Sequence, residues 1–97
     1  MSAERFEREY GCTETEWLRW LPGAVRAQPW ELSAPGRARV QIAAGQLTLS
    51  WTVLTPRAIG LVRMPRMAVR FVFEAVAAAE QREFLRYFDL YLQRGGG

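Results

Sequence analysis

Apolar and polar residues alternate along much of the middle of this chain. The alternation covers residues 37–43, 47–53 and 67–74, and a period of two is typical of strands with one buried face. A shorter apolar segment at 59–63 indicates one more strand. Because the breaks between these segments are short, consecutive strands are expected to pair as a four-stranded antiparallel meander.

Glycine and proline mark the expected turns between these strands. Gly45 and Gln46 form a candidate two-residue turn with glycine first, as a type II′ turn prefers. Pro56 interrupts the alternation, and proline is also the second residue of 64–67, where a type I turn favours it. We therefore expect the chain to leave the sheet at all three places.

Helices are expected at both ends of the chain. Residues 2–10 are rich in helix formers, and Thr13 and Glu16 match a capping box that opens a second, short helix before Pro22. Residues 77–93 carry an apolar stripe at helical spacing. The sequence therefore predicts two short N-terminal helices and one long C-terminal helix.

The predicted fold is α+β, a four-stranded antiparallel meander with short N-terminal helices and a long C-terminal helix packed on one face. Residues 26–36 are expected to form a loop, and residues 1–97 a single domain. The expected core takes the inward positions of the strands and the stripe of the last helix. Its members are Val40, Ile42, Leu49, Trp51, Val69, Phe71, Phe84 and Phe88.

Composition argues against most catalytic chemistry. The chain has no histidine and no lysine, one aspartate (Asp89) and one cysteine (Cys12). Histidine is the commonest general base near neutral pH and the commonest metal ligand, and a nucleophilic cysteine needs such a base. We therefore expect no enzyme activity, no catalytic residue, no cofactor and no metal, with Cys12 an inert thiol.

Two glutamates are candidates for a catalytic pair. Glu31 and Glu74 are the only acids between residues 17 and 79, but glycosidase chemistry requires a defined distance between two carboxyl groups. Sequence does not give that distance, and Glu74 is expected on the outward face of its strand. We therefore do not expect Glu31 and Glu74 to act as a catalytic pair.

Positive charge is concentrated in the middle of the chain. Residues 17–79 hold eight arginines against two glutamates, whereas residues 1–16 hold five glutamates against two arginines. Arginine binds phosphates and carboxylates, although its use in place of lysine also fits a GC-rich bacterial genome. The acidic N-terminal segment offers another way to neutralise the basic middle. The candidate anion-binding residues, on a sheet face or at nearby turns, are Arg37, Arg39, Arg63, Arg66 and Arg70.

Tryptophans suggest an apolar contact. Trp17, Trp20 and Trp30 are core, the lining of a ligand pocket or part of a dimer interface. The chain has more large apolar residues than one sheet and one long helix obviously cover, which favours a twofold dimer.

These patterns leave three hypotheses for function. The first is a small non-enzymatic binding or assembly module of a bacterial cytosol, acting as a homodimer or with a protein partner. The second is an anion or nucleic-acid binder that uses the arginine-bearing sheet face; nucleic acid is less favoured because the strand aromatics are expected inward. The third is a small-molecule-binding domain with a tryptophan-lined pocket. A single cysteine and the absence of an apolar segment of membrane-spanning length favour a cytoplasmic protein without membrane contact.

Overall fold

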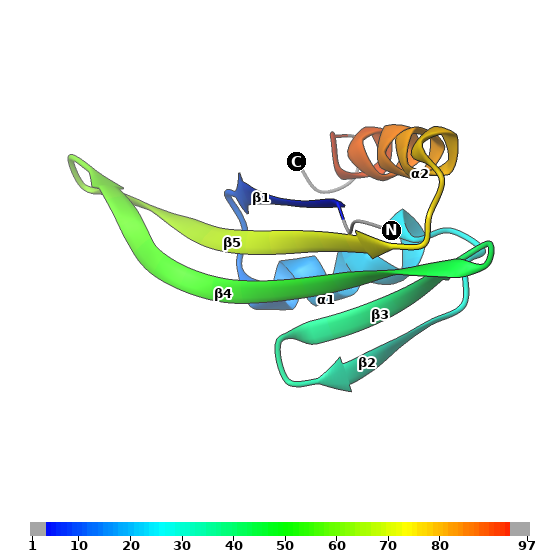
Figure 1. The fold of residues 1–97 in the computed structure, drawn as a ribbon. Coiled ribbons are helices and arrows are strands. Elements are labelled where there is room, and N and C mark those ends of the chain that lie inside the picture. The colour runs from blue at the N-terminus through cyan, green and yellow to red at the C-terminus, as the bar shows by residue number, and fades with distance from the viewer. Residues whose placement is uncertain (1–3, 94–97) are drawn as a thin grey trace.

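One five-stranded antiparallel sheet forms a layer, and two helices form a second layer on one of its faces (Figure 1). The computed structural model describes residues 4–93. The sheet order is β1-β5-β4-β3-β2. The elements are β1 (Glu4–Tyr10), α1 (Glu14–Ala24), β2 (Trp30–Ala34), β3 (Arg37–Ile42), β4 (Gly45–Ile59), β5 (Val62–Glu74) and α2 (Ala78–Tyr91).

The α+β class, the antiparallel sheet and the C-terminal helix on one face are confirmed, but the number of strands is wrong. The expected helix at 2–10 is strand β1, and it pairs with β5 at one edge of the sheet. Phe6 lies opposite Phe71, with the two rings stacked at 4.8 Å between centroids. Pairing with a strand about 60 residues away therefore overrides the local helix preference.

The stretch expected to be a loop contains a further strand. Residues 30–34 form β2, the other edge of the sheet, with Trp30 opposite Val40. The turn before β4 is also displaced. β4 begins at Gly45, so the two-residue turn is Ala43 and Ala44, with Ala43 at a positive φ of 53°.

The middle of the sequence forms one long hairpin rather than three separate pieces. The expected strand at 59–63 spans the tip between β4 and β5, and the expected turn at 64–67 lies inside β5. β4 continues through Pro56 by means of a bulge between Leu54 and Arg57. Proline is tolerated there because bulges and unpaired strand edges do not need its missing N–H.

Helix α1 begins at the expected capping box. The Glu16 amide donates to the Thr13 hydroxyl (3.1 Å), and the Thr13 amide donates to the Glu16 carboxylate (2.9 Å). The helix includes Pro22 and ends at Ala24, slightly later than expected. Helix α2 forms within the expected range of 77–93. No helix in residues 4–93 has the length and apolar character needed to cross a membrane.

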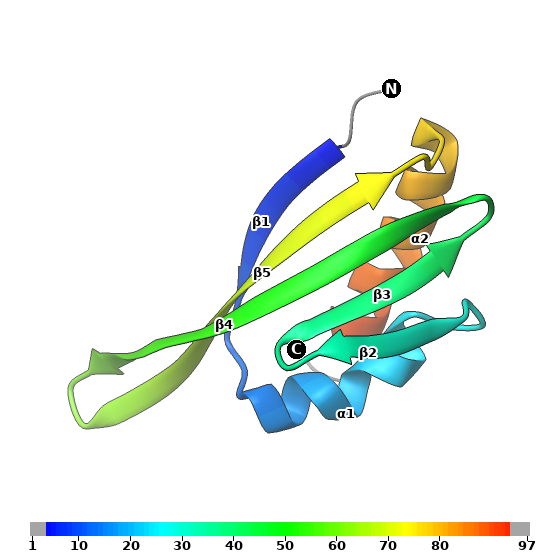
Figure 2. The same cartoon turned by 60° about the horizontal axis from the view of Figure 1, so that its bottom comes forward.

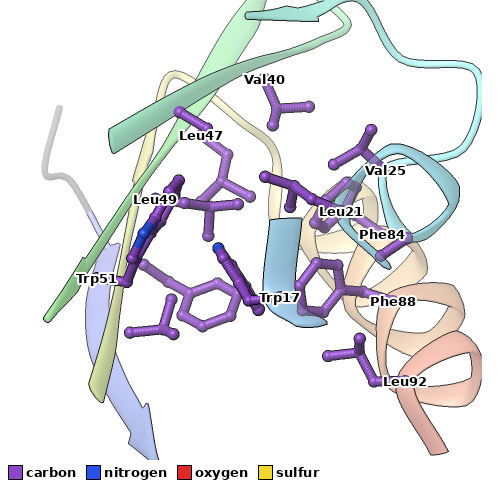
Figure 3. Packing of buried hydrophobic residues seen from close by; sticks show 14 of the residues in the cluster. Trp17, Leu21, Val25, Val40, Leu47, Leu49, Trp51, Phe84, Phe88 and Leu92 are labelled. Carbon is purple, nitrogen blue, oxygen red and sulfur yellow. The ribbon is translucent and has the colours of Figure 1, made fainter. Parts of the chain in front are cut away.

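The core lies between the sheet and both helices (Figure 3). All eight expected core residues are buried, so the inward and outward faces of the strands are assigned correctly. Trp17 of α1 contacts Trp51 of β4 and Phe88 of α2, with ring centroids 5.6 and 6.1 Å apart. Both helices therefore cover the same sheet face. The opposite face, which we call the outer face, has no helix on it in Figure 2.

Candidate functional site

The arginines expected on the outer face project there, but several have carboxylate partners. Arg39 is in β3 and Arg70 in β5, and both are exposed. Arg66, expected at a turn, is instead part of β5. The ion pairs of this face are Arg39–Glu31 (3.5 Å), Arg66–Glu9 (3.3 Å) and Arg70–Glu7 (3.0 Å).

Strand β1 supplies two of these three partners, Glu7 and Glu9. The acidic N-terminal segment thus neutralises part of the basic middle within one molecule. Arg37 and Arg63 make no ion pair within residues 4–93, but they lie in different strands, and Arg63 is far out on the long hairpin. The five candidate arginines do not form one free cluster, which reduces the positive charge that the outer face offers to an anion.

The β4–β5 hairpin extends well beyond the rest of the sheet (Figure 1). Pairing with β3 reaches Ser50, and pairing with β1 reaches Met67. Beyond these points β4 and β5 pair as strands only with each other, and we call residues 52–66 the arm. Its tip turns at Gly60, whose positive φ of 60° suits glycine.

The arm carries most of the exposed large apolar side chains. Among residues 4–93, five of the eight large hydrophobic residues that are exposed belong to it, and Leu61 at the tip is fully exposed. The other four are Val53, Ile59, Val62 and Met64. A two-stranded hairpin is marginally stable alone in water, so this concentration of apolar surface is typical of a contact site.

Positive charge accompanies the apolar residues of the arm. No aspartate or glutamate occurs between Glu31 and Glu74, whereas Arg57, Arg63 and Arg66 lie in the arm itself. Arg66 stabilises the base of the arm, because its Nε donates to the carbonyl oxygen of Thr55 (3.0 Å) in addition to its pairing with Glu9. The arm is therefore an apolar and basic projection.

The sequence identifies Arg63 and Arg66 of the arm as candidate anion-binding residues, but it does not predict the arm as an exposed apolar projection. Ile59 and Val62 lie directly opposite each other across Gly60 and Leu61, a two-residue turn with glycine first. The preference of type II′ turns for glycine, applied to Gly45 and Gln46, would have found this turn as well. The exposure of the arm does not follow from sequence, because it depends on how far the neighbouring strands reach.

The tryptophans expected at a pocket or interface do not come together. Trp17 is completely buried in the core, whereas Trp20 and Trp30 are partly buried. Trp30 lines an open hollow beside β2, and Trp17 and Trp20 line neither that hollow nor a smaller one at the end of α1. Trp17 is thus a core residue.

The hollow beside Trp30 is open and has a volume of about 640 Å³. Glu31 and Glu74 both line it, so the structure brings the candidate carboxylate pair to one place. Arg39 pairs with Glu31, and the Gln46 side chain donates to Glu74 at 3.0 Å. Both carboxylates are exposed and lack the apolar enclosure that makes a carboxyl group a general acid.

A second, smaller hollow lies between the end of α1, the β3–β4 turn and the first half of α2. Its volume is about 310 Å³, and we call it the groove. Val25, Ile42 and Phe84 contribute buried apolar side chains to it, whereas Glu80 and Glu83 are exposed.

A polar cluster that sequence reasoning missed joins β1 to α2. Asp89 of α2 accepts a hydrogen bond from Arg8 of β1, whereas Arg86 pairs with Glu83 (3.4 Å). Burial alone lowers the pKa of Arg8, but neighbouring Tyr10 and Asp89 outweigh it and raise the pKa above its ordinary value. For the Tyr10 hydroxyl, burial has the opposite effect and raises the pKa, and this effect outweighs the neighbouring positive charge of Arg8, which lowers it. The cluster fixes an edge strand to a helix, and its two charges compensate each other.

Cys12 is a poor nucleophile in this structure. Although it precedes the N-terminus of α1, burial, assisted by the negative charge of Glu16, raises its pKa to about 11. Thiols react as thiolates, so the environment suppresses the reactive form. Within residues 4–93, no group of three or more histidine, cysteine, aspartate or glutamate side chains is placed to hold a metal ion.

No protein-family model matches the chain, and a search of curated proteins finds no match either.

Proposed function

We propose that this chain is a small non-enzymatic assembly module of a bacterial cytosol and that it binds a second copy of itself through the arm. The observation that carries the proposal is the exposed apolar surface of residues 52–66. An apolar projection of this kind is stabilised when a partner covers it, because each buried Val, Leu or Ile side chain contributes about 1.5–3 kcal/mol.

The condition of the reactive side chains supports a non-enzymatic role. The Cys12 thiol is buried with its pKa at about 11, and Asp89 is engaged by Arg8. Glu31 and Glu74 share an open hollow in which each already has a partner. These groups stabilise the fold or its surface and do not form a nucleophile–base pair.

The arm is also suited to specific rather than indiscriminate association. Pro56 and Pro65 place a proline in each of its two strands, and proline at an exposed strand edge blocks the backbone pairing that leads to aggregation. Side chains rather than main-chain groups are therefore the recognition surface of the arm.

The test compares the wild type with a variant whose arm tip is polar: Ile59→Thr, Leu61→Ser and Val62→Thr. Light scattering over a micromolar dilution series measures the mass of each. The wild type is expected above the monomer mass at high concentration, and the variant at the monomer mass throughout. The melting temperature of the monomer should hardly change, because these side chains are exposed already.

Leu90→Gln is the matched control. Leu90 is 41% exposed but belongs to α2 rather than to the arm, so this variant should retain the mass of the wild type. A wild type with monomer mass at every concentration would overturn the proposal. So would a polar-tip variant that still associates.

A further inference from the structure

The groove lies at the opposite end of the molecule from the arm. Figure 1 shows the tip of the β4–β5 hairpin at the left end and the β3–β4 turn and the start of α2 at the right end. We infer that the arm of one copy docks into the groove of a second copy, an inference that rests on the self-association proposed above.

The groove and the tip of the arm match in polarity and charge. Ile42 and Phe84, which are 5% and 8% exposed, give the groove a small apolar surface, and Glu80 and Glu83 give it two exposed carboxylates. The arm presents apolar side chains at its tip, and Arg57 and Arg63 lie within two residues of the apolar tip residues along the chain. Apolar contact at the centre with opposite charges at the rim is the usual arrangement of a specific interface.

The one arginine of the groove is already engaged. The Arg26 guanidinium lies 4.2 Å from the centroid of the Tyr87 ring, within the range of a cation–π contact. Both residues line the groove. Glu83 pairs with Arg86 (3.4 Å), whereas Glu80 makes no ion pair within residues 4–93. Glu80 is therefore the carboxylate of the rim that remains for a partner.

An arm cannot reach the groove of its own chain. The molecule measures 47 Å along its longest axis and 25 and 22 Å along the others, and the two features occupy opposite ends of it (Figure 1). The hairpin has a regular ladder from Gln46 to Ile59 with a single bulge, so it does not fold back. The occupant must come from another molecule.

Two arms are poor partners for each other. Each carries Arg57 and Arg63, which make no ion pair within residues 4–93, so contact between tips would bring like charges together, which opposes association. Pro56 and Pro65 also limit the pairing of strand edges. The groove supplies the acidic groups that another arm lacks.

Charge reversal on each side provides the experiment. The arm-reversed protein carries Arg57→Glu and Arg63→Glu, and the groove-reversed protein carries Glu80→Arg and Glu83→Arg. Each alone should associate about a hundredfold more weakly than the wild type, because like charges then face each other. An equimolar mixture should recover association to within about tenfold of the wild type, since opposite charges meet again between the two proteins.

Analytical ultracentrifugation measures the association, with one protein of the mixture fluorescently labelled. Arg19→Glu combined with Arg82→Glu is the control, because it reverses two exposed arginines outside the arm and the groove. The control should associate as strongly as the wild type. Circular dichroism establishes that every variant is folded.

The outcomes separate this inference from the self-association on which it rests. If the wild type associates through the arm tip but the mixture of reversed proteins stays monomeric, the groove is not the receptor, and self-association stands. A wild type that stays monomeric, and whose arm instead retains it on heparin or on phosphatidylglycerol vesicles, overturns both. Only one result supports docking of the arm in the groove: each reversed protein associates weakly by itself, and the mixture of the two associates nearly as strongly as the wild type.

Discussion

Phe88 is the side chain whose removal should damage this fold most clearly. It is fully buried in α2 and contacts Trp17 of α1, Phe71 of β5 and Phe84 of its own helix, with ring centroids 6.1, 5.6 and 5.6 Å apart. Replacing a buried phenylalanine with alanine costs about 3–5 kcal/mol. Three aromatic contacts are lost together, so we expect Phe88→Ala to lie near the upper end of that range.

The expected loss is a large part of the total stability. A domain of this size unfolds with about 5–15 kcal/mol, and each kcal/mol shifts its melting temperature by roughly 4–8 °C. Urea denaturation followed by tryptophan fluorescence gives the free energy of unfolding. Phe88→Leu should cost less than about 1.5 kcal/mol because it keeps most of the volume. Leu90→Ala, at a position 41% exposed two residues further on, should cost less than about 1 kcal/mol. A loss from Phe88→Ala no larger than that from Leu90→Ala would refute the placement of α2 on the sheet.

Three further outcomes are expected. Gly45→Ala should destabilise the protein by about 1–3 kcal/mol or more, because the added Cβ would lie 2.2 Å from the carbonyl oxygen of Ala75, which follows β5. Gly11→Ala is the control: its Cβ would lie 3.8 Å from the nearest atom, so thermal unfolding should hardly change. For Cys12, a pKa raised from 9.0 to about 11 in the folded state means that its contribution to stability is complete below pH 9 and is lost as the pH rises to 11. Urea titrations across that interval should show a loss of about 2–3 kcal/mol that Cys12→Ala removes, and an equal slope in both proteins would contradict the raised pKa. Replacing Arg39 and Arg70 together with alanine should cost less than about 1 kcal/mol of stability at each site. Because both arginines are paired with glutamates, the salt concentration that elutes the protein from heparin should hardly change. A large fall in that concentration would favour an anion site on the outer face.

The positions of the core could be predicted from sequence because the alternation is unambiguous. In β3 and β5, apolar residues such as Val40 and Phe71 occupy every second position, and a register shift by one residue would expose all of them. The capping box at Thr13 is equally local, since both hydrogen bonds join residues three apart. Patterns confined to a few residues are sufficient for these parts.

Strand β1 could not be assigned in this way. Phe6 and Tyr10 are four residues apart, a spacing that places them on one face of either a helix or a strand. Arg8, between them, occupies the inward slot that an apolar residue would take in a clear strand. Only the pairing with β5 and the contact with Asp89 resolve the ambiguity, and these depend on residues far along the chain.

The arm could not be predicted from sequence for a related reason. Pro56 and Pro65 indicate breaks, because proline usually ends a strand in a fully paired sheet. They are accommodated here since β1 and β3 end before the arm begins. Neither this difference in strand length nor the exposure of Leu61 that follows from it is encoded in any short segment.

The pairing of the first strand with the last has a consequence for synthesis of the protein. β1 cannot join the sheet until residues 67–73 exist, and at about 5–20 residues per second the ribosome needs roughly 3–12 s to reach them. During that interval the backbone N–H and C=O groups of β1 have no partner strand and can pair with other nascent chains. Its seven residues include three glutamates and two arginines, and charge of this density opposes aggregation of an unpaired strand. The glutamates that later pair with Arg66 and Arg70 thus also keep β1 soluble until β5 has been synthesised.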